Sequence, residues 1–261
     1  MRIGFIDSGV GGLTVFAHVS AQVAADYIYL MDNKYLPYGE KSEAFIQQRL
    51  TQLSAYLIEL GAELIVIACN TATTQAVEHL RQQFSIPFVG VVPAIKPAAA
   101  LSQGKGFAVL ATPGTVNSPY LQGLIDQFAP GESVTTVGSS ELVRLAEEKV
   151  WFGVDVRQQV ADILSVSPLL AAEPKFVVLG CTHFPFLAAE ISALLPSGCQ
   201  LLDTGDAIAR RVAHLLKAMP PSDVVGHNCF ISTRALNAVQ QSRLPELGFD
   251  QHECWPIPLL Q

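Results

Sequence analysis

Two segments far apart in the chain repeat one pattern, in which a charged residue precedes an apolar run, a small residue, a cysteine and a polar pair. They are residues 63–71, ELIVIACNT, and residues 175–183, KFVVLGCTH. A short uninterrupted apolar run is typical of a strand buried in a parallel sheet. Each segment therefore predicts a strand-to-helix corner at the carboxyl end of a strand, which is where open α/β sheets bind ligands.

Elsewhere in the chain, short apolar runs bounded by turn residues alternate with amphipathic stretches of helical length. This alternation is typical of an α/β fold, with parallel strands covered by helices. Because the cysteine pattern occurs twice, we expect two similar doubly wound domains with mainly parallel sheets and an active site in the cleft between them. We expect residues 1–95 plus about 207–261 in the first domain and 96–206 in the second, although periodicity alone leaves the return of the last segment open.

The expected elements follow from these patterns. Strands are expected at 3–6, 27–31, 64–68, 88–90, 106–111, 133–137, 176–179, 200–202 and 228–232. Helices are expected at 12–23, 42–60, 71–84, 118–128, 155–165, 185–195 and 206–218.

Composition excludes several classes of protein. A chain with 50% hydrophobic and 15% charged residues is not disordered, and a net charge of −7 provides no basic surface for nucleic acid or an anionic membrane. The longest uncharged run, Gly106–Ile125, is interrupted by prolines and glycines, so it predicts no membrane span. The N-terminus lacks the apolar region of a signal peptide, and the five cysteines are an odd number. We therefore expect a cytoplasmic protein with free thiols and a small-molecule partner.

Cys69 and Cys181 are the first candidates for chemistry. Backbone N–H groups at the start of a helix lower a thiol pKa from about 8.5 toward neutrality, so either cysteine could act as a nucleophile or a base. Alternatively, each cysteine could be a small apolar residue buried in the core. The occurrence of a cysteine in two matching corners favours a functional role. Cys199, Cys229 and Cys254 lack this context and are expected to be packing residues.

Other corners provide further candidates. The loop Asp7–Gly12 lies between a strand and a helix and suits a carboxylate rather than a nucleotide, since Thr14 replaces a required glycine and no P-loop lysine follows. Alternatively, this loop could be a glycine-rich turn without a ligand, in which Asp7 caps the helix. The remaining candidates are single polar groups that ordinary turns and helix caps would also explain: the Tyr38–Gly39 turn, His183 beside Cys181, and the hydroxyls of Thr112, Thr115 and Thr182.

Two rival sites compete with this interpretation. A Cys–His hydrolase would use one cysteine and leave the equivalent one idle. A zinc site could be drawn from His227 with Cys229 and His252 with Cys254, but one-residue gaps are tighter than the usual ligand spacing, and in strands they only place both side chains on one face. We expect no metal site.

Two thiols that face each other across a cleft favour a different reaction. A thiolate on one side removes a proton from a carbon, and a thiol on the other side donates one to the opposite face, which inverts the stereocentre. The developing carbanion needs hydrogen bonds and helix dipoles in a closed cleft. This reaction requires neither a redox cofactor nor water.

Six segments resemble the glutamate racemase family. They are IGFIDSGVGGL from Ile3, LPYG from Leu36, ACNTAT from Ala68, GVVPAIKP from Gly90, LGCTHFP from Leu179 and DTGDAIAR from Asp203. The resemblance implies a cofactor-independent isomerase that interconverts L- and D-glutamate and supplies D-glutamate for bacterial peptidoglycan, cell-wall formation and cell shape. It also implies two similar α/β domains and suggests a homodimer.

The resemblance also implies roles for individual residues. Cys69 and Cys181 match the proton-transferring cysteines, while Asp7, His183 and Glu147 match assisting groups. Around Glu147 the chain departs from the family pattern, because the family's preceding Pro and following Ser-Gly are missing. The substrate-binding matches are the pairs Asp7 with Ser8, Tyr38 with Gly39, Asn70 with Thr71, and Thr182 with His183; Thr112 and Thr115 are added from their corner.

Two alternative functions remain open, and the resemblance also raises a question of regulation. The substrate could be aspartate or a related acid, although Asp7–Gly9 and Pro37–Gly39 favour glutamate. The chain could also be an inert carboxylate-binding module, against which the presence of both cysteines weighs. Finally, some family members carry an N-terminal extension linked to activation by a peptidoglycan precursor; this chain starts on its first expected strand, so we expect no such activation.

Overall fold

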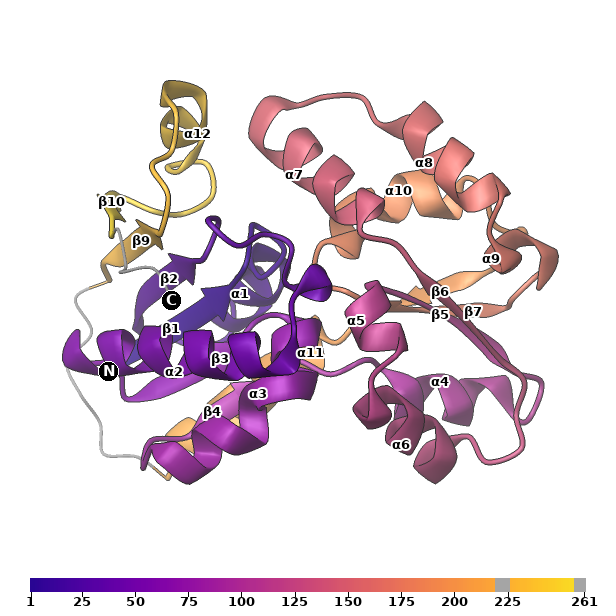
Figure 1. Cartoon of the computed structure of the whole chain (residues 1–261), viewed down its shortest axis with the longest axis horizontal. Coiled ribbons are helices and arrows are strands. Elements are labelled where there is room, and N and C mark those ends of the chain that lie inside the picture. The colour runs from indigo at the N-terminus through magenta and orange to yellow at the C-terminus, as the bar shows by residue number, and fades with distance from the viewer. Residues whose placement is uncertain (219–225, 256–261) are drawn as a thin grey trace.

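A computed structural model describes residues 1–218 and 226–255. The strands form two separate sheets, which lie side by side in Figure 1, and each strand pairing within a sheet is parallel. The α/β class with two parallel sheets is therefore confirmed. The domain limits expected from the sequence stay a prediction, and their segments 219–225 and 256–261 lie outside the described residues.

The larger sheet combines the first part of the chain with its end. Its strand order is β10-β9-β2-β1-β3-β4, and β1 to β3 are apolar runs buried on both faces, apart from the exposed first residue of β1. The bounds are β1 Arg2–Asp7, β2 Asp26–Met31, β3 Leu64–Ile67, β4 Phe88–Gly90, β9 Asn228–Ser232 and β10 Gln251–Cys254.

The smaller sheet repeats the strand order at the centre of the larger one. Its order is β6-β5-β7-β8, which corresponds to β2-β1-β3-β4. In both sheets the second strand is added on one side of the first strand and the third strand on its other side. Ligands of open α/β sheets bind at this switch point in the strand order. The bounds are β5 Phe107–Ala111, β6 Val134–Gly138, β7 Phe176–Gly180 and β8 Gln200–Leu202.

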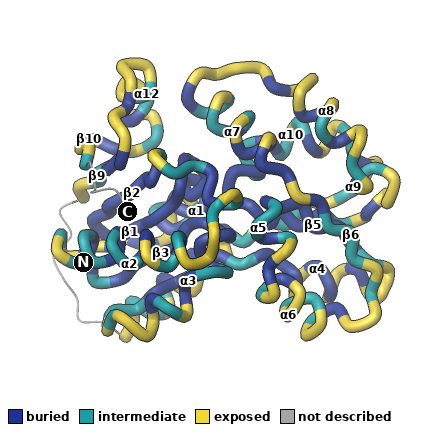
Figure 2. Tube along the Cα trace, in the orientation of Figure 1, coloured by how far each residue is buried: buried dark blue, intermediate teal, exposed yellow. Residues whose placement is uncertain are grey.

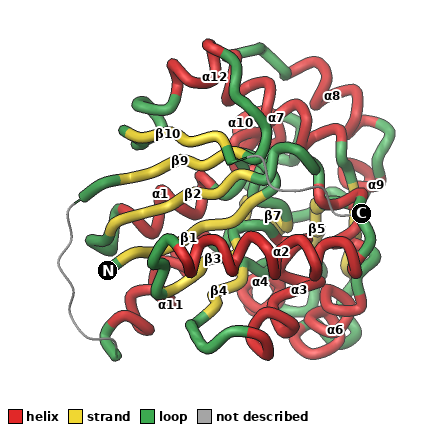
Figure 3. The backbone as a smooth tube through the Cα atoms, turned by 60° about the vertical axis from the view of Figure 1, so that its left-hand side comes forward, coloured by secondary structure: helices red, strands yellow, loops and turns green. Residues whose placement is uncertain are grey.

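Helices cover both faces of the larger sheet (Figures 1 and 3). On one face α1 and α11 pack on Phe5, Tyr27 and Tyr29, and on the other α2 and α3 pack on Ile65 and Ile67. Figure 2 shows that the central strands are buried while the outer helix faces are exposed. The bounds are α1 Leu13–Ser20, η1 Tyr38–Glu40, α2 Glu43–Glu59, α3 Asn70–Gln83, α11 Gly205–Leu216 and α12 Ala238–Arg243.

The smaller sheet is also covered on both faces. One face carries apolar side chains of α7, α8, α9, η2 and α10, and the other those of α4 and α6. The short helix α5 lies at the carboxyl end of β5 and contacts η1 of the other part, and α7 contacts α12. The bounds are α4 Ile95–Ser102, α5 Pro113–Val116, α6 Pro119–Phe128, α7 Glu141–Phe152, α8 Arg157–Ser165, α9 Pro168–Ala171, η2 Phe184–Leu187 and α10 Ala188–Ser192.

Each expected strand is confirmed within one residue at either end. The expected helix at 185–195 is wrong in form, because the segment begins as the 3-10 turn η2 and becomes helical only at Ala188. The sequence interpretation missed α4, α5, α7, α9, α12, η1 and β10, most of which are short. Within residues 1–218 and 226–255, no helix is long and apolar enough to cross a membrane.

Candidate active site

The carboxyl ends of the central strands of both sheets meet at one small cavity of about 240 Å³. β1 ends at Asp7, Cys69 follows β3, Thr112 follows β5 and Cys181 follows β7. The cavity lining combines both parts of the molecule: Ser8, Pro37, Tyr38, Gly39, Cys69, Asn70 and Thr71 from the larger, and Thr112, Val143, Cys181 and His183 from the smaller. The structure therefore brings the two predicted cysteines to one cavity.

Four further predicted residues lie behind this lining: Asp7, Thr115, Glu147 and Thr182. Each contacts a residue or loop of the lining, and Thr182 also lines a second cavity that shares Cys181 and Asn70 with the first. Substrate contact by Asp7, Thr115 and Thr182 stays a prediction. Thr115 lies beside Thr71, and Thr182 donates a hydrogen bond from its hydroxyl to Oδ2 of Asp7 at 3.1 Å.

Cys69 lies at the N-cap of α3 in extended backbone conformation, as the sequence pattern predicts. The expected lowering of its pKa is wrong. Burial raises the pKa of the Cys69 thiol well above its usual range, and the charge of Asp7 adds to this effect. The N–H groups of Ala72 and Thr71 oppose the rise without cancelling it. These surroundings therefore favour the protonated thiol of Cys69.

Cys181 does not repeat this geometry. It is followed by a turn and by η2, whose N-cap is His183, so no regular helix begins at the cysteine. Its thiol instead lies beside a side chain: Sγ is 3.8 Å from Nδ1 of His183. The two corners thus share a strand-end position but differ in what contacts the sulfur.

His183 links Cys181 to Glu147. The imidazole Nε2 lies 2.7 Å from Oε1 of Glu147, and the ring is almost completely buried. Burial alone would lower the pKa of His183, but hydrogen bonds to Cys181 and Glu147 and the negative charge of Glu147 raise it well above the usual value. The buried pair is therefore a charged imidazolium against a carboxylate.

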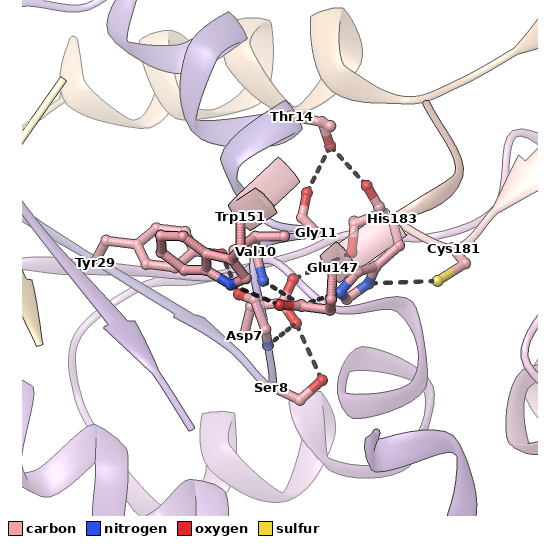
Figure 4. Close-up of polar contacts among 12 residues, drawn as sticks. Asp7, Ser8, Val10, Gly11, Thr14, Tyr29, Glu147, Trp151, Cys181 and His183 are labelled. Carbon is pink, nitrogen blue, oxygen red and sulfur yellow. Dashed lines mark hydrogen bonds and ion pairs between the residues drawn. The ribbon is translucent and has the colours of Figure 1, made fainter. Parts of the chain in front are cut away.

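Glu147 lies on α7 and both of its carboxylate oxygens are engaged (Figure 4). Oε1 accepts a hydrogen bond from the backbone N–H of Val10 at 2.7 Å as well as facing His183. Oε2 accepts one from the indole N–H of Trp151 at 2.9 Å. Neither Val10 nor Trp151 was singled out from the sequence, because α7 was not expected; the apolar spacing of residues 142, 143, 146 and 150 was the available signal.

Asp7 ends β1 and lies fully buried beneath the glycine-rich loop. Its Oδ1 accepts hydrogen bonds from the Ser8 hydroxyl at 3.3 Å and from the Gly9 N–H at 3.2 Å. Burial raises the pKa of Asp7 to about 6, and the nearby positive charge of His183 limits this rise. Asp7 can therefore hold or release a proton close to neutral pH.

The free energy of unfolding is expected to depend on pH because of the buried Asp7 carboxyl. The pKa of Asp7 is about 6 in the folded protein against an ordinary value of 3.8. Between these pH values the native state holds a proton that the unfolded chain has lost, so ionisation of Asp7 lowers the free energy of unfolding by about 2 kcal/mol as pH rises from 4 to 7. Asp7→Asn cannot ionise, and its stability relative to wild type should improve by about 2 kcal/mol over this range.

Urea unfolding near pH 4 and pH 7 measures this difference. The exposed Asp126 on α6 provides the control, since Asp126→Asn should follow the wild-type pH dependence. An Asp7→Asn protein whose pH dependence also parallels wild type would contradict the assignment.

The glycines of the first loop make room for protein side chains. A Cβ on Gly9 would lie 1.9 Å from Oε1 of Glu147, and a Cβ on Gly11 would lie 2.4 Å from Nδ1 of His183. The expected close approach of this backbone to another group is therefore present, but the groups that approach are Glu147 and His183.

Tyr38 lies at the cavity with its hydroxyl turned away from it. The hydroxyl donates a hydrogen bond to Oδ2 of Asp32 at 2.6 Å, so it is engaged within the protein. Asp32 also accepts from Arg49 Nε and Nη2 at 2.8 and 2.7 Å and from the Thr233 hydroxyl at 2.7 Å. This buried cluster holds the turn that carries Gly39, whose Cβ position lies 2.8 Å from the Thr112 side chain.

Hydroxyl and amide groups on the cavity wall come from both parts of the chain. Thr71 Oγ1 lies 2.8 Å from Thr112 Oγ1 and 3.2 Å from Thr115 Oγ1. By contrast, Oδ1 of Asn70 is buried without a hydrogen-bond partner. A buried unpaired acceptor is costly, so this amide is suited to a ligand donor.

The rival zinc site does not form at the positions proposed for it. His227 Nδ1 contacts Asp250 at 3.2 Å, and His252 Nε2 contacts the Ser232 hydroxyl at 3.1 Å. Across the described part of the chain, no group of three or more His, Cys, Asp or Glu side chains could hold a metal ion.

Comparisons with known proteins agree on one family. The pattern of the family described as Asp/Glu/Hydantoin racemase matches residues 3–212. Glutamate racemase of Shewanella denitrificans is 48% identical over 221 residues, covering 84% of this chain and 79% of that protein. Glutamate racemase of Yersinia enterocolitica is 42% identical over 257 residues, covering 96% and 89%.

Solved structures give the same result. Escherichia coli glutamate racemase, in complex with L-glutamate and the activator UDP-MurNAc-ala, superposes with a TM-score of 0.89 at 41% identity, covering 97% of each chain. Glutamate racemase of Francisella tularensis, in complex with D-glutamate, superposes with a TM-score of 0.80 at 26% identity, also covering 97% of each.

Proposed function

Because the chain belongs to the Asp/Glu/hydantoin racemase family and is an amino-acid racemase, we propose that it interconverts L- and D-glutamate with Cys69 and Cys181 as the two acid–base groups. One observation supports this mechanism most strongly: two cysteines from corresponding corners of two sheets line a single cavity. No cofactor takes part in the proposed reaction.

The proposed reaction moves protons only. One cysteine thiolate takes the proton from the α-carbon, so that a C–H bond breaks and an S–H bond forms. The electron pair left on the carbon then takes the proton of the other cysteine thiol on the opposite face, which leaves that sulfur as the thiolate. The two sulfurs exchange roles in each turnover, and the reverse reaction uses the same groups.

The two sulfurs reach the thiolate form with different help. At Cys181 the imidazolium of His183 lies beside the sulfur and stabilises its negative charge, while Glu147 holds the ring in place. At Cys69 the N–H groups of Thr71 and Ala72 at the start of α3 supply the stabilisation. Since burial disfavours the Cys69 thiolate, proton transfer there relies on a closed site in which these dipoles are not screened by water.

Glutamate is the substrate that the surroundings of the cavity support. The unpaired Asn70 amide oxygen can accept from an ammonium group, and the Ser8, Thr71 and Thr112 hydroxyls can donate to carboxylates. The relatives at 42–48% identity are glutamate racemases, and solved relatives hold L- or D-glutamate. The whole chain has a net charge of −7, but hydroxyls and helix N–H groups at the site can still attract the carboxylates of glutamate.

The biological setting is part of the same proposal. A supply of D-glutamate for peptidoglycan, and hence for cell-wall formation and cell shape, follows from the family resemblance, as do a cytoplasmic location and a homodimer. The acidic composition gives no support to a nucleic-acid or membrane partner.

Incubation in heavy water tests the proposal directly. Either enantiomer of glutamate, mixed with the protein without pyridoxal phosphate or metal, is expected to acquire deuterium at the α-carbon and to convert to its mirror image. Proton NMR and a chiral separation measure the two outcomes together, and aspartate in parallel tests substrate choice.

Three results would decide against it. Binding of glutamate by calorimetry without exchange would indicate a carboxylate-binding module, and racemisation of aspartate in preference to glutamate would indicate another substrate. A requirement for an added cofactor would remove the two-cysteine mechanism.

A further inference from the structure

Trp151 connects the two parts of the molecule through its ring. It lies on α7, whose side chains Leu142, Val143 and Ala146 belong to the apolar core of the smaller sheet. The Trp151 ring instead belongs to the core of the larger sheet, where it meets Phe230 of β9 edge-on with 6.3 Å between ring centroids. Only 2% of Trp151 is exposed. The helix is therefore anchored in both cores, and Val150 beside Trp151 also packs against the larger one.

The same side chain also holds the group that acts on His183. Its indole N–H donates to Oε2 of Glu147 at 2.9 Å, four residues earlier on the helix. The other oxygen of Glu147 faces His183 of the smaller part and accepts from the Val10 N–H of the larger part. As Figure 4 shows, the carboxylate lies between Trp151 and His183. Three donors thus determine the orientation of one carboxylate, and His183 in turn contacts Cys181.

These contacts depend on one another through the position of α7. If α7 withdrew from the larger sheet, the Val10 hydrogen bond and the Phe230 contact would be lost together, since both partners belong to the larger part. Glu147 would then keep only its contacts within the smaller part. A carboxylate free to rotate stabilises a buried imidazolium less than one that is fixed.

We propose that Trp151 is a positioning residue for the racemisation: its packing on the larger sheet and its hydrogen bond to Glu147 align the His183–Cys181 pair only while the two parts are closed on each other. This inference rests on the proposed racemase activity. It assigns Trp151 no contact with the substrate, because Trp151 acts through Glu147.

A double-mutant cycle separates this role from simple packing. Trp151→Phe keeps an aromatic ring against Phe230 and removes only the N–H donor. We expect kcat to fall about tenfold with little change in KM, which is the size of one lost hydrogen bond to a charged group. In a Glu147→Gln background the same change should alter kcat less than about twofold, because coupled residues are not additive.

Trp255 provides the matched control, since the chain has two tryptophans. Trp255 stacks on Tyr56 at the far edge of the larger sheet, 3.5 Å between centroids, so Trp255→Phe should leave both kinetic constants unchanged. Circular dichroism confirms that each variant is folded before kinetics are measured.

The Trp255→Phe protein also allows a measurement that needs no change at Trp151. With ¹⁵N-labelled tryptophan its NMR spectrum contains one indole N–H signal. That signal should move when Glu147→Gln is added, and it should move again when glutamate closes the site. This readout holds even if Trp151→Phe fails to fold.

The outcomes distinguish the inference from the activity on which it rests. A wild-type protein that does not racemise glutamate would remove the proposed function. A wild type that does, together with equal tenfold losses for Trp151→Phe in both backgrounds, would show that Trp151 acts only through packing. Unchanged kcat in folded Trp151→Phe, or an indole signal indifferent to Glu147→Gln, would also overturn the proposal.

Discussion

Replacing Cys69 or Cys181 by alanine is expected to lower kcat for glutamate racemisation by about 10²- to 10⁴-fold, the usual contribution of a positioned acid or base. Both thiols line the same cavity, and none of the other three cysteines is part of its lining. The losses should be similar, because each turnover uses both sulfurs in either direction. Polarimetry with each enantiomer as substrate measures them.

One-sided exchange makes this prediction sharper. A protein that keeps only one cysteine can still remove and return the α-proton on that face, so it should exchange deuterium into one enantiomer without inverting it. Cys69→Ala and Cys181→Ala should act on opposite enantiomers. Cys199→Ala is the control, since Cys199 lies in the loop before β8 and outside the cavity lining. Wild-type turnover in either active-site variant would refute the assignment.

Arg49→Met is expected to lower the free energy of unfolding by about 3 to 5 kcal/mol, since it leaves a buried carboxylate without its partner. Asp32 and Arg49 are both fully buried, and two guanidinium nitrogens contact the carboxylate at 2.7 and 2.8 Å. Tyr38 and Thr233 also donate to Asp32, but neutral hydroxyls cannot balance its charge. Chemical denaturation monitored by circular dichroism gives the loss.

Two further variants test the cause of that loss. Arg157→Ala breaks an ion pair with Asp155 that is exposed on the surface, so its cost should be far smaller than that of Arg49→Met. Adding Asp32→Asn to Arg49→Met should recover part of the stability, because the unpaired charge disappears. A double variant less stable than Arg49→Met alone would show that the charge is not the source.

The sequence was sufficient for nine of the ten described strands and for the cysteine positions. Apolar runs such as Leu64–Ile67 have no other stable place than a buried parallel strand, and strand ends in such sheets converge by topology. For this reason Cys69 and Cys181 could be assigned to one site before any coordinates were known. The repeated strand order confirms the duplication that the two cysteine segments indicated.

Properties that depend on distant contacts were not predictable in this way. The pKa of Cys69 follows from burial and from Asp7, and local helix geometry alone predicted the wrong direction. The Tyr38 hydroxyl turns to Asp32, a residue to which no motif drew attention. The Glu147 site requires Val10, which lies 137 positions away in the sequence. No local pattern records such a contact.

The unequal surroundings of the two sulfurs have a kinetic consequence. Mirror-image amino acids have equal free energies, so at equilibrium the two enantiomers are present in equal amounts whatever the enzyme does. One sulfur, however, faces an imidazolium–carboxylate pair and the other faces helix N–H groups. The enzyme form that starts the conversion of L to D therefore differs in energy from the form that starts the conversion of D to L. The maximal rates from L and from D can therefore differ, but only if the Michaelis constants differ in the same ratio. The equal free energies of the two enantiomers thus fix the end point of the reaction, while the asymmetry of the site determines which enantiomer is turned over faster at saturation.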